Sequence, residues 1–324
     1  MNEIYDADLA STIKSTIWGD LLTADKKERP LLAHYTSMEN AEKILTGGEL
    51  WFSNPRNMND WDEMRHGIEL LQFLARTQFD RHLGTGSDSI TKVLSALIAN
   101  IEQCIKDFET YGAPDTYVFC FAEHEPDDND GVLSMWRGYG NGGSGVAIVF
   151  DGTRVPEIEG HALVLFPVEY GSEADRRTYV ERILDAATRL ALQWDAPKDI
   201  EMIAQNLVDR VIVATLFSKH KGFESEREWR AVYRPEWDAE GRFESLLGYH
   251  HGSGLMEPRL KLPIDKIPGF PEGALSIETL VSKILLGPVA AKDLVLHAFR
   301  RMLVEKKLDP LIVRTTASRI PFRG

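Results

Sequence analysis

The spacing of hydrophobic and polar positions along this 324-residue chain predicts helices and strands in an irregular order. Apolar residues recur at helical spacing in six segments, 8–22, 61–80, 89–109, 174–193, 198–218 and 290–306. Short apolar runs predict strands at 31–35, 49–53, 117–121, 146–150, 162–170, 228–233, 281–286 and 311–315. A capping box, Thr36-Ser37-Met38-Glu39, predicts one more helix over 37–46, ending at Gly47-Gly48.

This order lacks the regular alternation of a doubly wound sheet. No glycine-rich phosphate-binding fingerprint follows the first expected strand. The glycines over 138–145 come before a strand rather than opening a helix, so they do not form a dinucleotide-binding loop. The pattern therefore predicts a mixed α/β or α+β fold. We expect a single domain over 1–324 with a helical insertion at about 61–110.

Composition narrows the class of protein. Hydrophobic residues make up 43% of the chain and charged residues 27%, as in globular domains. The net charge of −13 repels polyphosphate at long range, so non-specific nucleic-acid binding is not expected. No apolar run approaches the roughly 18 residues of a membrane helix, and the first residues do not form a secretion signal. Two cysteines give neither a zinc framework nor a disulfide scaffold, which fits a reducing cytoplasm.

The most informative segment is the late run Glu226-Arg227-Glu228-Trp229-Arg230. Strand alternation predicts Glu226, Glu228 and Arg230 on one face and Trp229 on the other. Two carboxylates and a guanidinium on one strand face are costly unless they pair or meet a ligand. We therefore expect a functional site here, the alternative being charges paired with one another at the rim.

Two further segments carry candidate chemistry. His34 ends an apolar strand just before a helix N-terminus, which attracts anions and lowers the pKa of a nearby imidazole. A neutral His34 would hydrogen-bond a ribose hydroxyl or an amide, or else be a satisfied structural histidine. Trp136 and Tyr139 lie three residues apart on one helix face. They either stack on a nucleobase or nicotinamide ring or pack in the core.

Other polar positions give weaker signals. Asp60 and Glu63, with Asn59 before them, either organise a site or simply cap a helix with acidic first-turn residues. Lys221 lies in a local basic stretch, and the acidic loop 123–130 is expected to be exposed. Neither an H-E-x-x-H pattern nor a G-x-S-x-G elbow is present, so the chain favours neither a zinc enzyme nor a Ser-His-Asp hydrolase.

These blocks, in this order, resemble an uncharacterised prokaryotic family catalogued as domain of unknown function 2971. The blocks that carry the resemblance are His34-Tyr35-Thr36-Ser37, Leu50-Trp51-Phe52-Ser53-Asn54-Pro55, Asn59-Asp60 with Glu63, Met135-Trp136 with Tyr139-Gly140, Lys221, and Glu226–Arg230. The resemblance continues through Ile284–Pro288 and Ile320–Arg323, so that it covers nearly all of 31–324. The family implies no established reaction.

A more distant likeness is to ADP-ribosyltransferase folds. These place a His or Arg on an early strand, an aromatic or serine-bearing strand next, and a Glu late, often as E-x-E. The likeness implies a split sheet with helical insertions and NAD as the substrate. His34 would hold the nicotinamide-side ribose or amide, and Glu228, beside Glu226, would bond the ribose 2′-hydroxyl and stabilise the oxocarbenium ion. The other residues expected to contact NAD are Tyr35, Thr36, Trp51, Phe52, Ser53, Trp136, Tyr139 and Arg230.

Three functions are therefore expected, in order of preference. The first is a cytoplasmic ADP-ribosyltransferase or NAD glycohydrolase that cleaves the nicotinamide–ribose bond. It would need no metal and would modify an unknown protein or nucleic-acid acceptor in a toxin or phage-defence setting. The second is a Mg²⁺-dependent nuclease or phosphotransferase that uses Asp60, Glu63, Glu226 and Glu228. The third is a non-catalytic ligand-sensing or interaction module.

Overall fold

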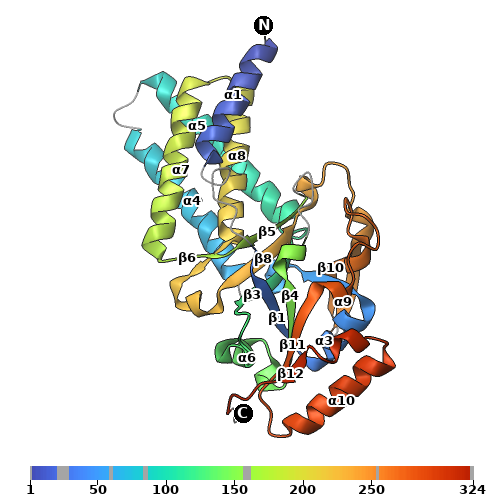
Figure 1. Ribbon diagram of the computed structural model, residues 1–324. Helices are drawn as coiled ribbons and strands as arrows, with labels where there is room; N and C mark the ends of the chain where they lie inside the picture. The colour runs from blue at the N-terminus through green and yellow to red at the C-terminus, as the bar shows by residue number, and fades with distance from the viewer. Residues whose placement is uncertain are drawn as a thin grey trace. The chain divides into compact units, whose positions relative to one another are not determined.

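The computed structural model describes residues 2–19, 29–57, 61–82, 87–155, 162–252 and 255–321 (Figure 1). The chain divides into two compact units. A helical unit takes three segments, Met1–Lys26, Arg56–Pro114 and Glu169–Gly222. A sheet unit takes the other three, Lys27–Pro55, Asp115–Val168 and Phe223–Gly324. The helical stretch expected at about 61–110 is therefore part of a larger helical unit, which also contains Met1–Lys26 and Glu169–Gly222.

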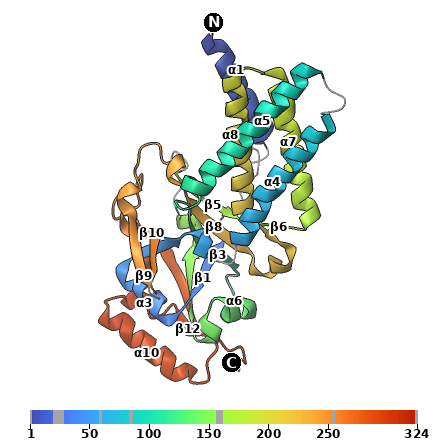
Figure 2. The same ribbon diagram turned by 180° about the vertical axis from the view of Figure 1, so that it is seen from behind.

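The helical unit is built from long amphipathic helices that pack along one another (Figure 2). Its helices are α1 (Asn2–Ile17), α4 (Trp61–His82), α5 (Asp88–Asp107), α7 (Glu173–Gln193) and α8 (Pro197–Leu216). Ser172 and Asp175 form a capping box at the start of α7, and Pro197 opens α8. Two short parallel strands complete the unit, β6 (Glu169–Gly171) and β7 (Ser218–His220).

The sheet unit contains one sheet, in which ten strands are described. They are β1 (Leu31–Thr36), β2 (Glu49–Ser53), β3 (Tyr117–His124), β4 (Val146–Asp151), β5 (Leu163–Pro167), β8 (Glu228–Tyr233), β9 (Leu247–Gly252), β10 (Leu255–Pro263), β11 (Val281–Leu286) and β12 (Thr315–Ala317). All neighbouring pairs in this sheet are antiparallel except β11 with β12. With the helices of both units, this sheet confirms the predicted α+β class.

The sheet divides at β3. One edge of β3 pairs with β8, which in turn pairs with β5. The other edge is shared, because β1 pairs with its C-terminal part, from Ala122, and β2 pairs with it at Val118. One branch then continues through β4, β11 and β12, and the other through β10 and β9. Among the strands that the structure describes, the registers of β1 and β2 with β3 leave out residues 119–121, which lie between the two branches.

Helices cover both faces of the strands and create two separate cores. The α3 face carries the larger core, and α3 (Met38–Gly47), α9 (Ile277–Leu280) and α10 (Lys292–Glu305) pack on it. The opposite α6 face carries a smaller core around α6 (Leu133–Gly138). Both views show α3 and α10 on one side of the strands and α6 on the other (Figures 1 and 2). Because successive strand residues point to opposite faces, each side chain faces only one of these cores.

Most of the expected elements are present, with small changes at their ends. The strand expected at 228–233 and the one at 281–286 match β8 and β11. The short apolar runs predict no strand between 233 and 281, yet this stretch contains the hairpin of β9 and β10. The strand expected at 162–170 divides into β5 and β6, which belong to different sheets.

Candidate functional site

His34 lies on the α3 face at the point where the sheet divides. It is the register partner of Ile148, a residue of the larger core, and its ring lies 4.2 Å from the ring of Phe119. Its Nδ1 is 2.9 Å from the carbonyl oxygen of Cys120. A carbonyl oxygen only accepts hydrogen bonds, so Nδ1 carries the proton and donates it. The imidazole thus donates a hydrogen bond to the backbone of β3 between the two branches. His34 therefore has the structural role that was the alternative to ligand binding.

Burial sets the charge state of His34. Desolvation lowers the pKa of the imidazole to about 4, and the bond to the Cys120 carbonyl opposes this shift only in part. The ring is therefore neutral at pH 7. The expected low pKa is present, and its main cause is the apolar surroundings of the ring.

Glu228 and Arg230 lie on the other face of the sheet. Glu228 is the register partner of Ala122, which belongs to the core on the α6 face. Arg230 donates from Nε to Glu228 Oε1 at 2.8 Å and from Nη2 to Oε2 at 2.9 Å. The two residues are only 5% and 4% exposed. As expected, they share one strand face, and they form a buried bidentate ion pair there.

His34 and Glu228 consequently do not meet. They lie on β1 and β8, with β3 between them, and they point to opposite faces of the sheet. The expectation that these two side chains line one pocket for a dinucleotide is wrong. Strand alternation is the physical reason. It directs the His34 ring toward Phe119 on the α3 face, whereas Glu228 is the register partner of Ala122 on the α6 face.

Glu226 departs from the strand pattern in a different way. It ends a 3-10 helix over Lys221–Glu226, and β8 begins only at Glu228. Between them Arg227 has a left-handed backbone with φ of 45°. The prediction that Glu226 shares a strand face with Glu228 is therefore wrong. Glu226 instead accepts a hydrogen bond from the hydroxyl of Tyr139 at 3.4 Å.

The two aromatic residues of the α6 segment have different environments. Trp136 is fully buried and packs edge-on against Tyr35, with ring centroids 4.8 Å apart. Trp136 is thus a core residue, one of its two expected roles. Tyr139 ends the helix and is 43% exposed. The hydrogen bond to Glu226 places an exposed aromatic ring next to a carboxylate, and we call these two residues the Tyr139–Glu226 pair.

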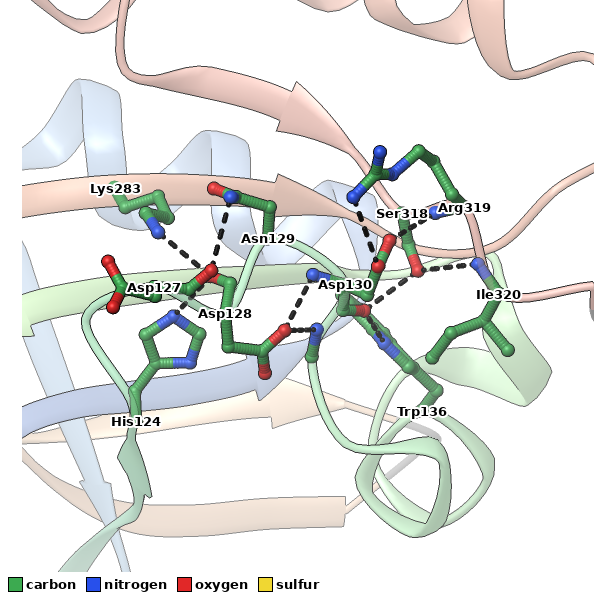
Figure 3. A network of polar contacts seen from close by, with 11 residues as sticks. His124, Asp127, Asp128, Asn129, Asp130, Trp136, Lys283, Ser318, Arg319 and Ile320 are labelled. Atoms are coloured by element: carbon green, nitrogen blue, oxygen red, sulfur yellow. Dashed lines mark hydrogen bonds and ion pairs between the residues drawn. The ribbon is translucent and has the colours of Figure 1, made fainter.

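A polar network holds α6 in place (Figure 3). The Asp130 carbonyl accepts from Trp136 Nε1 at 2.9 Å and from the Ser318 hydroxyl at 2.7 Å. The Lys283 ammonium donates to the carbonyls of Pro126 and Asp128. The acidic loop 123–130 is exposed at 125–127 and at 129, as expected, and its hydrogen bonds also connect β3, α6 and the C-terminal segment.

Tyr35 is also part of this support. Its hydroxyl accepts a hydrogen bond from the backbone N–H of Val132, just before α6. Burial raises the pKa of the Tyr35 hydroxyl to about 12, with a smaller contribution from the charge of Asp128. Thr36 is likewise buried. Neither side chain lies at an exposed surface where a ligand could reach it directly.

The block on β2 alternates between core and surface. Phe52 is buried in the larger core, 5.5 Å from the ring of Phe119. Trp51 points to the opposite face, is 37% exposed, and has the Lys261 ammonium 4.4 Å from its ring centroid. Its indole N–H donates to Glu49 at 2.8 Å. Ser53 shares the face of Trp51 and is the register partner of Val118. Trp51 is thus already covered by a cation from its own chain.

The remaining candidates lie in the helical unit or outside the described residues. Asn59 and Asp60 are outside the described part of the chain, and of Glu63 only the backbone, in α4, is described. Lys221 is exposed at the start of a 3-10 helix. Among the described residues, no three His, Cys, Asp or Glu side chains are grouped so as to hold a metal ion.

One comparison with known proteins gives a match. The model of a family described as a protein of unknown function (DUF2971) matches residues 135–231. This range begins just before Trp136 and ends just after Arg230, so it contains both segments that meet in the Tyr139–Glu226 pair. The expected resemblance to that family is supported over this part of the chain. Searches of curated proteins and of solved structures found no match.

The described helices also bear on membrane association. None of them, over the ranges that the structure covers, combines the length and apolarity needed to cross a lipid bilayer.

The buried ion pair makes a first prediction. Replacement of Glu228 by Gln leaves the Arg230 charge buried without its carboxylate, so we expect a loss of about 3 kcal/mol in the free energy of unfolding. Urea denaturation measures this loss. Glu226→Gln is the matched control and should change stability by less than about 1 kcal/mol, because its bond is exposed. Equal stability of Glu228→Gln and wild type would contradict a buried pair.

The environment of His34 makes a second prediction. Its pKa is lower in the folded protein than the ordinary 6.5, so the unfolded chain binds the proton first as the pH falls. Stability should therefore decrease between about pH 6.5 and pH 4, by at most about 3 kcal/mol from this residue. Unfolding free energies measured across this range should fall less steeply in His34→Gln. His124, whose pKa burial also lowers, leaves a residual slope in both proteins. Identical slopes would show that desolvation does not lower the pKa of His34 in the folded protein.

Proposed function

We propose that this protein binds NAD or a related nucleotide at the Tyr139–Glu226 pair. One observation carries the proposal: an exposed aromatic ring and a carboxylate, from two segments 87 residues apart, are held together by a hydrogen bond. A flat aromatic ring stacks on a nucleobase or a nicotinamide. A carboxylate accepts hydrogen bonds from ribose hydroxyls.

Two observations favour the Tyr139–Glu226 pair over the set that was expected first, His34 with Glu228. His34 lies on the α3 face of the sheet, and its Nδ1 donates a hydrogen bond to the carbonyl of Cys120. Glu228 is buried and holds Arg230 through both carboxylate oxygens. Glu226 is the residue of the acidic motif that reaches the surface, beside Tyr139. The role that the likeness to ADP-ribosyltransferase folds gave to Glu228 therefore passes, in this proposal, to Glu226.

The proposed reaction is cleavage of the nicotinamide–ribose bond. A carboxylate next to the ribose stabilises the positive charge that develops on the sugar as nicotinamide leaves. Transfer of ADP-ribose to a protein or nucleic-acid acceptor would follow, and water would take the place of the acceptor in a glycohydrolase. A cytoplasmic role in a toxin or phage-defence setting belongs to the same proposal.

A second candidate is the non-catalytic sensing module. The observation that favours it is the pairing of Glu228 with Arg230, which leaves one carboxylate of the acidic motif at the surface. Such a module would bind the nucleotide and release no product. The metal-dependent nuclease is favoured by no observation, since Glu226 and Glu228 lie on different segments and Glu228 is bound to Arg230.

Calorimetric titration with NAD tests the binding step. We expect saturable binding by the wild type, weakened about tenfold in Tyr139→Leu, because stacking of one ring contributes about 1–3 kcal/mol. Glu226→Gln should weaken binding by about the same factor through the lost ionic hydrogen bond. Tyr111→Leu and Glu39→Gln are matched controls, since they change an exposed tyrosine and an exposed glutamate elsewhere. Absence of NAD binding by the wild type, or full affinity in both site variants, would overturn the proposal.

Release of nicotinamide separates the enzyme from the sensing module. Chromatography of NAD incubated with the protein, with and without cell extract as a source of acceptor, measures this product. We expect nicotinamide from the wild type and at least a hundredfold less from Glu226→Gln. Binding without any nicotinamide would assign the protein to the sensing class.

A further inference from the structure

We propose that Arg227 is a positioning residue, which holds Glu226 against Tyr139 through a left-handed turn clamped by two carboxylates. This inference rests on the proposed function for its importance to ligand binding. Its structural part, the turn and its clamp, can be tested without a ligand.

The backbone of Arg227 determines the direction of Glu226. A φ of 45° is rare for a residue with a side chain, because the Cβ atom crowds the following carbonyl. In this conformation the Arg227 N–H donates to the carbonyl of Glu224 at 3.2 Å, which closes the preceding helical turn. The Arg227 carbonyl accepts from the N–H of Glu123 at 2.8 Å, which joins the segment to the end of β3. The turn therefore ends the 3-10 helix and starts β8, and Glu226 leaves the alternation of the strand.

The side chain of Arg227 supplies the clamp. Its Nε donates to Glu123 Oε2 at 2.7 Å, and its Nη1 donates to Glu125 Oε1 at 2.6 Å. The Nη2 atom also lies 2.6 Å from the same Glu123 oxygen. One guanidinium thus bridges the carboxylates of Glu123 and Glu125, which lie two residues apart at the end of β3. Planar guanidinium groups suit such a fork better than an ammonium does.

A strained conformation persists only where its surroundings hold it, and such positions gather at functional sites. Here the clamp and the backbone bonds act on the residue next to Glu226. Because Tyr139 is held separately by α6, the distance between its hydroxyl and Glu226 depends on the turn at Arg227. A change at Arg227 should therefore move the carboxylate without disturbing the tyrosine.

Substitution of Arg227 by glycine and by alanine distinguishes the effect of the backbone conformation from the effect of the side chain. Both remove the clamp, but glycine adopts a positive φ without strain and alanine does not. Hydrogen exchange of the Glu123 amide, which is bonded to the Arg227 carbonyl, reports the turn directly. We expect exchange at least tenfold faster than wild type in Arg227→Ala and within about threefold of wild type in Arg227→Gly.

Affinity for NAD reports the position of Glu226 in the same variants. We expect a loss of about tenfold in Arg227→Ala, most of it restored in Arg227→Gly. A role limited to stability would lower the melting temperature of both variants and leave both affinities unchanged. Exchange of the Glu123 amide at the wild-type rate in Arg227→Ala, or equal effects of glycine and alanine, would overturn the inference. If the wild type does not bind NAD, the proposed function fails and the exchange rates alone decide the role of the turn.

Discussion

Side chains along the strands of this sheet alternate between two covered faces, and this alternation decides which residues can meet. It directs the side chains of β1 and β8 alternately to one core or the other, so that Leu32 and Trp229 belong to the larger core and Ala33 and Tyr35 to the smaller one. His34 joins Phe119 and Phe52, whereas Glu228 joins the core around Trp136. Two polar residues that look like partners along the sequence are thereby separated by the thickness of the sheet.

The division of the sheet at β3 explains why polar groups lie inside it. Where β1 and β2 part, the carbonyl of Cys120 accepts a hydrogen bond from the His34 imidazole. On the opposite face Arg230 lies beside Cys120 in the register, and Glu228 neutralises it. Both polar residues satisfy groups of the fold, so polarity at these positions is no evidence of catalysis by itself.

Much of the fold could be predicted from the sequence, because its strands are short apolar runs and its helices have regular spacing. The hairpin of β9 and β10 was missed because His250, His251 and Pro258 do not resemble a strand, yet β10 pairs with β2 through its other end. The meeting of Tyr139 with Glu226 could not be predicted, since the left-handed backbone of Arg227 breaks the alternation on which the prediction relied. The residue types around Arg227 do not predict that turn. Its ion pairs with Glu123 and Glu125 form only because β3 and β8 lie side by side in the fold.

The proposed binding of NAD at the Tyr139–Glu226 pair, rather than across His34 and Glu228, should protect a distinct set of backbone amides. Hydrogen exchange of the whole chain, measured with and without saturating NAD, distinguishes the two placements. We expect slower exchange in 133–140 and 221–228, with 31–37 unchanged. Protection centred on 31–37 and on the α3 face, with no change at 133–140, would contradict the proposed placement.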